Sequence, residues 1–118
     1  MPSIPAANPP TPPAMSGTGG GLTFAALQEL IRGRYFATDS ARGTPATFMW
    51  LIEEIGELST ALANNAAGKT PTAEERANLD EEFADVIAWL CTLANINGVD
   101  LTKALEKYTV KGVEGEKS

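Results

Sequence analysis

Two short acidic segments of this chain follow one pattern. The segments EEIGE, residues 53–57, and EEFAD, residues 81–85, each place two acids, a large apolar residue, a small residue and a third acid in the same order. Clustered carboxylates repel one another unless cations neutralise them or their pKa values rise. Because carboxylate oxygens suit hard cations, the repeated pattern indicates a site for Mg²⁺ or Mn²⁺ rather than for zinc.

Both segments lie in stretches with helical periodicity, and each stretch has an apolar stripe. A helix turns by about 100° per residue, so Glu54 lies roughly 90° and Glu57 roughly 150° from the centre of its stripe. Glu82 and Asp85 occupy the same angles on the second stretch. The stripe residues are Phe48, Leu51, Ile52, Ile55, Leu58 and Leu62 on the first stretch, and Phe83, Val86, Ile87, Leu90, Leu93 and Ala94 on the second.

These angles predict where the carboxylates meet. Two helices that pack through their stripes and are joined by a short loop would be antiparallel neighbours. The carboxylate pairs beside the two stripes would then converge on one groove. Glu53 and Glu81 lie nearly opposite the stripes. Because glutamate is also a good helix former, a solvated acidic face is the alternative. The residues alone leave both interpretations open.

Composition excludes several classes of function. The chain has 118 residues, enough for one domain, and a net charge of −6 without a basic cluster, which argues against a nucleic-acid polymer as partner. It has no histidine, which excludes Ser-His-Asp triads and Glu-x-x-His di-iron sites. No apolar run is long enough to cross a membrane, so no membrane partner is expected.

The single cysteine, Cys91, lies in the apolar run VIAWLCTLA and is expected to be a small buried side chain. One thiol cannot form a disulfide within the chain. The N-terminus also lacks the charged and apolar regions of a signal peptide. A reducing, cytoplasmic location is therefore expected.

Three regions of the chain differ in composition. Residues 1–21 hold six of the eight prolines and no charged side chain, so we expect a disordered tail that cannot offset its ordering entropy. Residues 22–112 carry the helical patterns and form the expected domain. Residues 113–118 form an expected disordered C-terminal end.

Four helices are expected in this domain, and the alternating pattern typical of strands is absent. Thr44 as N-cap before Pro45 starts the second helix, and Thr72 with Glu75 forms a capping box for the third. Gly98 is a typical residue after a helix end. The class is all-α with two long central antiparallel helices. The expected spans are 24–35 after the N-cap Thr23, 45–65, from Thr72 to the NING segment at 95–98, and 101–111 after the N-cap Asp100.

The acidic segments and their flanks resemble a known family. WLIEEIGELSTAL, residues 50–62, and DEEFADVIAWLCTLANINGVDLTKALEKY, residues 80–108, are similar to the MazG-like all-α nucleoside triphosphate pyrophosphohydrolases. The family motif EExxE followed by ExxD is matched here with 24 residues between its halves. The resemblance covers about residues 22–111 and implies a four-helix MazG-like bundle completed by oligomerisation.

This resemblance implies Mg²⁺-dependent cleavage of (d)NTPs between the α- and β-phosphates, giving a monophosphate and pyrophosphate. It also implies a house-cleaning role in the nucleotide pool. Glu53, the first motif acid, would hold a water or a second metal ion. The implied metal ligands are Glu54, Glu57, Glu82 and Asp85.

Four further residues are candidates for substrate binding. Lys107 and Lys111 lie where members of the family commonly place basic residues near the phosphates. Arg42 could bind a phosphate through two N–H groups, and Trp50 could stack on the base. The alternatives are a positively charged helix end for the lysines, a solvated loop for Arg42, and core or subunit packing for Trp50.

Members of the family assemble as dimers or tetramers, so the resemblance implies a homodimer or homotetramer. About 90 ordered residues also make a thin core for a lone subunit. The side chains expected at the interface lie outside the stripes: Met49, Trp50, Ala61, Ala88, Trp89 and Cys91.

Two other functions remain open beside this enzymatic one. The first is a non-catalytic helical module whose acidic groove binds only metal or meets a protein partner. The second, within the same superfamily, is a phosphoribosyl-ATP pyrophosphohydrolase.

Overall fold

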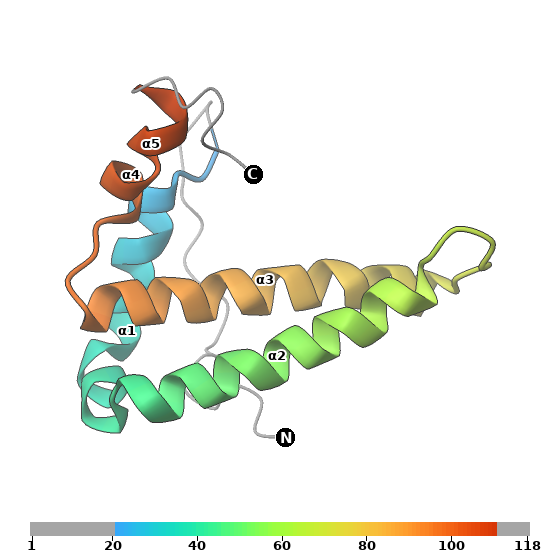
Figure 1. The fold of residues 1–118 in the computed structure, drawn as a ribbon, viewed down its shortest axis with the longest axis horizontal. Coiled ribbons are helices and arrows are strands. Elements are labelled where there is room, and N and C mark those ends of the chain that lie inside the picture. The colour runs from blue at the N-terminus through green and yellow to red at the C-terminus, as the bar shows by residue number, and fades with distance from the viewer. Residues whose placement is uncertain (1–20, 111–118) are drawn as a thin grey trace.

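The computed structural model describes residues 21–110, and within them all regular structure is helical. The helices are α1 Phe24–Arg42, α2 Thr44–Asn64, α3 Ala73–Ile96, α4 Leu101–Ala104 and α5 Glu106–Thr109 (Figure 1). The expected all-α class is therefore confirmed. The expected N-terminal tail before Gly21 and the expected C-terminal end at 113–118 lie outside the described residues.

Helix α1 is longer than the sequence predicts. Thr23 caps it as expected, and its hydroxyl accepts a hydrogen bond from a backbone N–H of the first turn at 3.1 Å. The helix does not end near Gly33 but continues to Arg42, and Gly43 ends it with a φ of 83°. Arg42 forms an ion pair with Asp39 one turn earlier. This pair stabilises a last turn that local propensity alone does not predict.

Helices α2 and α3 begin close to where their start signals predict. Gly43, rather than Thr44, is the N-cap of α2, and Thr44 and Pro45 open its first turn. Thr72 and Glu75 form the expected capping box at the start of α3, with donor–acceptor distances of 2.9 and 3.0 Å. The difference at α2 arises because a glycine with positive φ can end one helix and begin the next.

The segment after α3 is attached to α1. Gly98 follows α3 with a φ of 69°, as expected at a helix end. Asp100 caps α4, but two short helices replace the single one that was expected. The Gln28 side chain on α1 donates to the Val99 carbonyl at 2.6 Å and accepts from the Leu101 N–H at 3.0 Å. This glutamine therefore fixes the place where α4 begins.

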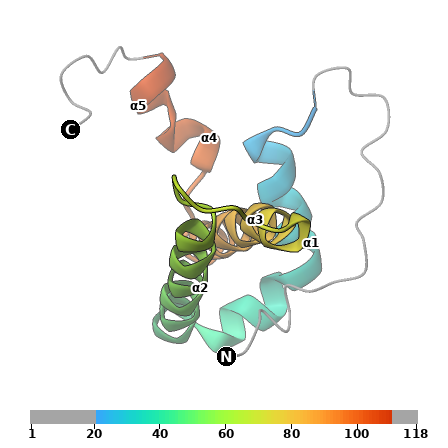
Figure 2. The same ribbon diagram turned by 90° about the vertical axis from the view of Figure 1, so that its right-hand side faces the viewer.

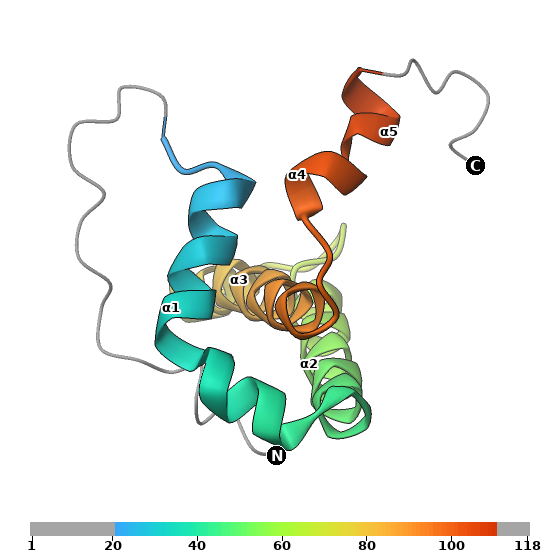
Figure 3. The same cartoon turned by 90° about the vertical axis from the view of Figure 1, so that its left-hand side faces the viewer.

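The two long helices, α2 and α3, run antiparallel and lie side by side, as expected (Figures 1 and 2). Helix α1 crosses α3 and ends at the start of α2, while α4 and α5 extend away from the α2–α3 pair (Figure 3). Among residues 21–110, no helix combines the length and the apolar character needed to cross a membrane.

Helices α2 and α3 pack through only part of the expected stripes. Leu51 and Trp89, which are 3% and 0% exposed, form the core between them, with Val86 and Leu93 packed against it. The prediction that the pair packs through its apolar stripes therefore holds for Leu51, Val86 and Leu93 but not for most of the other stripe residues. Seven stripe residues lie outside the pair and are 37–51% exposed: Phe48, Ile52, Ile55, Leu62, Phe83, Ile87 and Leu90.

Several side chains expected at a subunit interface lie inside the subunit instead. Ala61, Trp89 and Cys91 are fully buried, whereas Met49 is 68% exposed. Burial also raises the pKa of the Cys91 thiol, as suits a structural cysteine. Helical periodicity separates two faces of a helix, but it does not tell which face the same chain covers.

Candidate metal centre

Three carboxylates from the two long helices meet within one subunit. One carboxylate oxygen each from Glu54 on α2 and from Glu82 and Asp85 on α3 lie within 4.8 Å of one another. The i, i+3 spacing puts Glu82 and Asp85 on neighbouring positions of α3, and antiparallel packing brings Glu54 against them. We call these three residues the carboxylate cluster.

The carboxylate cluster is buried to a degree that is rare for acidic side chains. Glu54 is 1% exposed, Glu82 is 8% exposed, and Asp85 is half-buried. Oε2 of Glu54 and Oε1 of Glu82 are buried without a hydrogen-bond partner. Buried carboxylates without partners are costly, so the arrangement suits either a bound cation or protonated acids.

Burial and mutual repulsion raise the pKa values of the cluster. Burial, followed by the charges of Glu57, Asp85 and Glu82, raises the pKa of Glu54 from 4.5 to about 7. Burial, followed by the charge of Glu57, also raises the pKa values of Glu82 and Asp85. A cation among these groups would favour their charged forms and oppose both causes.

The other acids of the two segments surround the cluster. Glu57 is half-buried, and its charge acts on all three clustered carboxyl groups, which places it at the edge of the cluster. Glu81 is exposed, and its charge raises the pKa values of Glu82 and Asp85. Glu53 is also exposed, in agreement with its angle opposite the stripe.

Arg42 lies between two tryptophans and not in a solvated loop. Its guanidinium carbon is 4.9 Å from the ring centroid of Trp50 and 5.0 Å from that of Trp89, and the two rings form an edge-to-face pair with centroids 5.4 Å apart. Nε donates to Thr47 Oγ1 at 2.9 Å, and Nη2 donates to Asp39. The Arg42 side chain is only 11% exposed. It therefore serves the core of this subunit, and its geometry gives no support to the predicted phosphate contact.

The other predicted substrate residues lie in different parts of the structure. Trp50 is half-buried against Trp89, which agrees with the packing alternative. Lys107 is exposed on α5, with Nζ 5.5 Å from the ring centroid of Tyr108, and α5 extends away from the α2–α3 pair (Figure 1). Lys111 lies outside the described residues. A phosphate role for the lysines stays a prediction.

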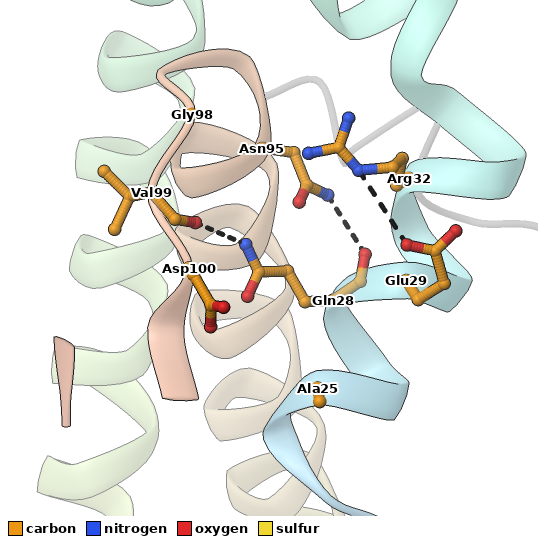
Figure 4. Close-up of a pocket in the computed structure, with 8 residues that line it drawn as sticks. All are labelled: Ala25, Gln28, Glu29, Arg32, Asn95, Gly98, Val99 and Asp100. Atoms are coloured by element: carbon orange, nitrogen blue, oxygen red, sulfur yellow. Dashed lines mark hydrogen bonds and ion pairs between the residues drawn. The ribbon is translucent and has the colours of Figure 1, made fainter. Parts of the chain in front are cut away.

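A polar pocket of about 300 Å³ lies between α1, the end of α3 and the segment before α4. The amides of Gln28 and Asn95 stand in its wall, where Asn95 Nδ2 donates to the Gln28 carbonyl at 3.1 Å (Figure 4). Glu29 and Arg32 also line it, and Arg32 Nε is 3.9 Å from Glu29 Oε2. No residue that lines this pocket belongs to the carboxylate cluster, so this pocket and the acidic site are separate features.

Comparison with known proteins connects the carboxylate cluster to a family. Residues 43–116 match the model of the MazG nucleotide pyrophosphohydrolase domain. The chain belongs to the MazG family. A crystal structure of iMazG from Vibrio DAT 722 is similar to this chain, with 34% sequence identity and a TM-score of 0.59 over 81% of this chain and 100% of that one. A comparison with curated proteins gave no match.

The MazG match includes every motif acid but leaves all of α1 outside its range. Sequence reasoning missed the buried roles of Asp39 and Thr47, which α1 and α2 bring to Arg42. The i, i+3 spacing of Asp39 and Arg42 was a usable signal, because such pairs stabilise helices. That spacing could have extended the first predicted helix to its observed end.

Proposed function

We propose that this MazG-family chain is a divalent-metal-dependent pyrophosphohydrolase that cleaves nucleoside triphosphates, including deoxynucleotides, between the α- and β-phosphates. The products would be a nucleoside monophosphate and pyrophosphate, in keeping with a house-cleaning role. The observation that carries this proposal is the buried carboxylate cluster of Glu54, Glu82 and Asp85 within the region that matches the family.

The residues of the cluster fit a hard cation, Mg²⁺ or Mn²⁺. The donors are all oxygens, and two of them are buried without partners. Glu54, Glu82 and Asp85 would hold the ion, and Glu57, at the edge of the carboxylate cluster, would be a fourth ligand. When bound, the ion would neutralise phosphate charge and lower the pKa of an attacking water.

The chain's own residues would perform the remaining steps. Helices α2 and α3 hold the carboxylates on rigid elements, which suits precise placement of a phosphate chain. Glu57 is half-buried beside the cluster and would accept the proton that the attacking water loses. Because Glu53 is exposed and outside the cluster, its role toward a water or a second ion stays a prediction.

We also propose that the active form is a homodimer or homotetramer. The apolar residues on the outside of the α2–α3 pair support this proposal, since seven large side chains are 37–51% exposed on two adjacent helices. Monomeric proteins rarely leave contiguous apolar patches larger than roughly a few hundred Å² exposed. The interface would therefore use the stripes, with Met49 beside them, and not the buried residues that were first expected.

The deciding experiment is a nucleotide panel. The protein is incubated with Mg²⁺ and each of the common NTPs and dNTPs, and with phosphoribosyl-ATP, and pyrophosphate and orthophosphate are measured separately. Pyrophosphate with an equal amount of monophosphate is expected. Asp85→Asn and Glu57→Gln should lower turnover by orders of magnitude, whereas Glu29→Gln, an exposed acid away from the cluster, should not. Orthophosphate as the first product, or no product from any nucleotide, would contradict the proposal.

A further inference from the structure

Two buried polar groups beside the metal centre lack partners and complement each other. The indole Nε1 of Trp89 is a donor without a hydrogen bond, and Glu54 Oε2 is an acceptor without one. Trp89 is 0% exposed and Glu54 is 1% exposed, so neither group faces the bulk solvent. The indole N–H lies close enough to the Glu54 carboxylate to lower its pKa slightly, although no hydrogen bond of standard geometry joins them.

The energetics favour contact between these two groups. An unpaired buried donor or acceptor is unfavourable, and buried tryptophan N–H groups usually find a partner. The acceptor is also anionic whenever a cation occupies the centre, and a hydrogen bond to a charged acceptor is stronger than one to a neutral acceptor.

The Trp89 ring is held in position by side chains from α1 and α2. Arg42 covers it at 5.0 Å from the ring centroid, and Trp50 meets it edge-to-face at an interplanar angle of 78°. Arg42 is fixed in turn by Thr47 and Asp39. The end of α1 is thereby linked to Glu54 through one indole ring.

We propose that Trp89 is a positioning residue of the metal centre, whose indole N–H donates to Glu54 and keeps that carboxylate directed at Glu82 and Asp85, while Arg42 holds the ring. Partners of this kind orient metal ligands, and their loss typically lowers metal affinity roughly 10- to 100-fold. The ion in this inference rests on the proposed function. The hydrogen bond itself does not, and it can be tested without metal.

The first test uses nuclear magnetic resonance on the metal-free protein. The chain has two tryptophans, so its indole N–H groups give two signals, which the Trp50→Phe variant assigns. Glu54→Gln replaces the charged acceptor and should move the Trp89 signal. Glu53→Gln, at the exposed neighbouring position, should leave it in place. An unchanged Trp89 signal in Glu54→Gln overturns the inference, whatever the protein does with nucleotides.

The second test measures Mn²⁺ binding by calorimetry, without nucleotide. Trp89→Phe should bind Mn²⁺ roughly 10- to 100-fold more weakly than the wild type. Trp50→Phe is the matched control, because it removes the other indole of the same pair and the other ring beside Arg42. Equal Mn²⁺ affinities in the two variants overturn the inference. No Mn²⁺ binding by the wild type would instead contradict the proposed function.

A third variant separates the N–H from the ring. Benzothienylalanine at position 89, in the Trp50→Phe background, keeps the bicyclic shape and replaces the N–H by sulfur. It should weaken Mn²⁺ binding to about the level of Trp89→Phe, even if Trp89→Phe itself folds poorly. Wild-type affinity in this variant would show that the ring matters only for packing, and would overturn the inference.

Discussion

A carboxylate oxygen of Glu54 on α2 lies within 4.8 Å of one of Glu82 on α3, and both side chains are buried. The two acids come from segments 28 residues apart in the sequence and meet because the two helices that carry them are antiparallel. Two acids in such contact need either a proton or a cation between them. The first two predictions follow from this requirement.

The stability of the metal-free protein should fall as the pH rises from about 4.5 to about 7. Folding raises the pKa of Glu54 from 4.5 to about 7, so the folded state binds a proton more tightly than the unfolded chain does. The tighter proton binding adds about 3 kcal/mol at most to the free energy of unfolding. This contribution is fully present below pH 4.5 and is lost as the pH rises through about 7. Urea unfolding in EDTA at several pH values measures it.

The stabilisation of the protein by Mg²⁺ should increase as the pH rises, whereas the stability of the metal-free protein falls. Because the ion competes with protons for the carboxylates, Mg²⁺ should raise the unfolding midpoint more at pH 8 than at pH 5. Equal effects of Mg²⁺ at both pH values would contradict binding at the carboxylate cluster.

Glu54→Gln should make the metal-free protein more stable than the wild type at pH 8, by about 1–3 kcal/mol. The amide keeps the shape of the side chain and removes a buried charge that is repelled by its neighbours. It should also abolish the stabilisation by Mg²⁺. Glu53→Gln is the control, because that exposed carboxylate lies outside the cluster, and it should behave as the wild type. If Glu54→Gln were less stable than the wild type while Glu53→Gln were unchanged, this result would contradict charge repulsion in the cluster.

Arg42→Ala should destabilise the protein by about 3 kcal/mol, because it leaves the buried Asp39 carboxylate without a counter-charge and removes a side chain packed on two rings. Arg32→Ala is the matched control, since Arg32 also has an i, i+3 acid and a ring contact, with Glu29 and Phe36. Both side chains of that ion pair are exposed, so its loss should cost less than about 1 kcal/mol. Urea unfolding at constant pH compares the two, and equal effects would argue against a buried role for Arg42.

Ile52→Glu and Phe83→Glu should each shift the protein toward a monomer. Both residues belong to the exposed apolar stripes, and a carboxylate in a buried subunit interface would be costly. Thr60→Glu is the control, because Thr60 is an exposed polar residue of α2 outside its stripe. Light scattering after size-exclusion chromatography gives the molar mass. A monomeric wild type would contradict the proposed assembly.

Local signals predicted the helices better than their ends or their packing. The caps at Thr23, Thr72 and Asp100 are formed as expected because each depends on residues within one turn. The extension of α1 to Arg42 was missed although the i, i+3 pair of Asp39 and Arg42 is a local signal. Arg42 also contacts Trp50 and Trp89, which follow the helix in the sequence. Propensity over a short window does not contain such contacts.

In the site, too, features that depend on local spacing were predicted better than features that depend on tertiary packing. The spacing of the acids, together with packing through the stripes, predicted that Glu54, Glu57, Glu82 and Asp85 could converge on one groove. The structure brings the carboxylates of Glu54, Glu82 and Asp85 together. The stripes supply only part of the packing face, because Leu51, Val86 and Leu93 lie in the core while most other stripe residues are exposed. A stripe that includes Ile52 and Phe83 is equally amphipathic whether its cover comes from the same chain or from another molecule. Only the three-dimensional structure decides that question.

The sealed environment of Cys91 has a practical consequence for measuring distances in solution. The chain has one cysteine, it is fully buried, and burial raises the pKa of its thiol, so it should react slowly with maleimides at neutral pH. A cysteine introduced at an exposed position such as Thr60 or Lys103 would then take up a spin label or dye selectively, without removal of the native residue. Pairs of such labels would report how the helices of neighbouring subunits are arranged.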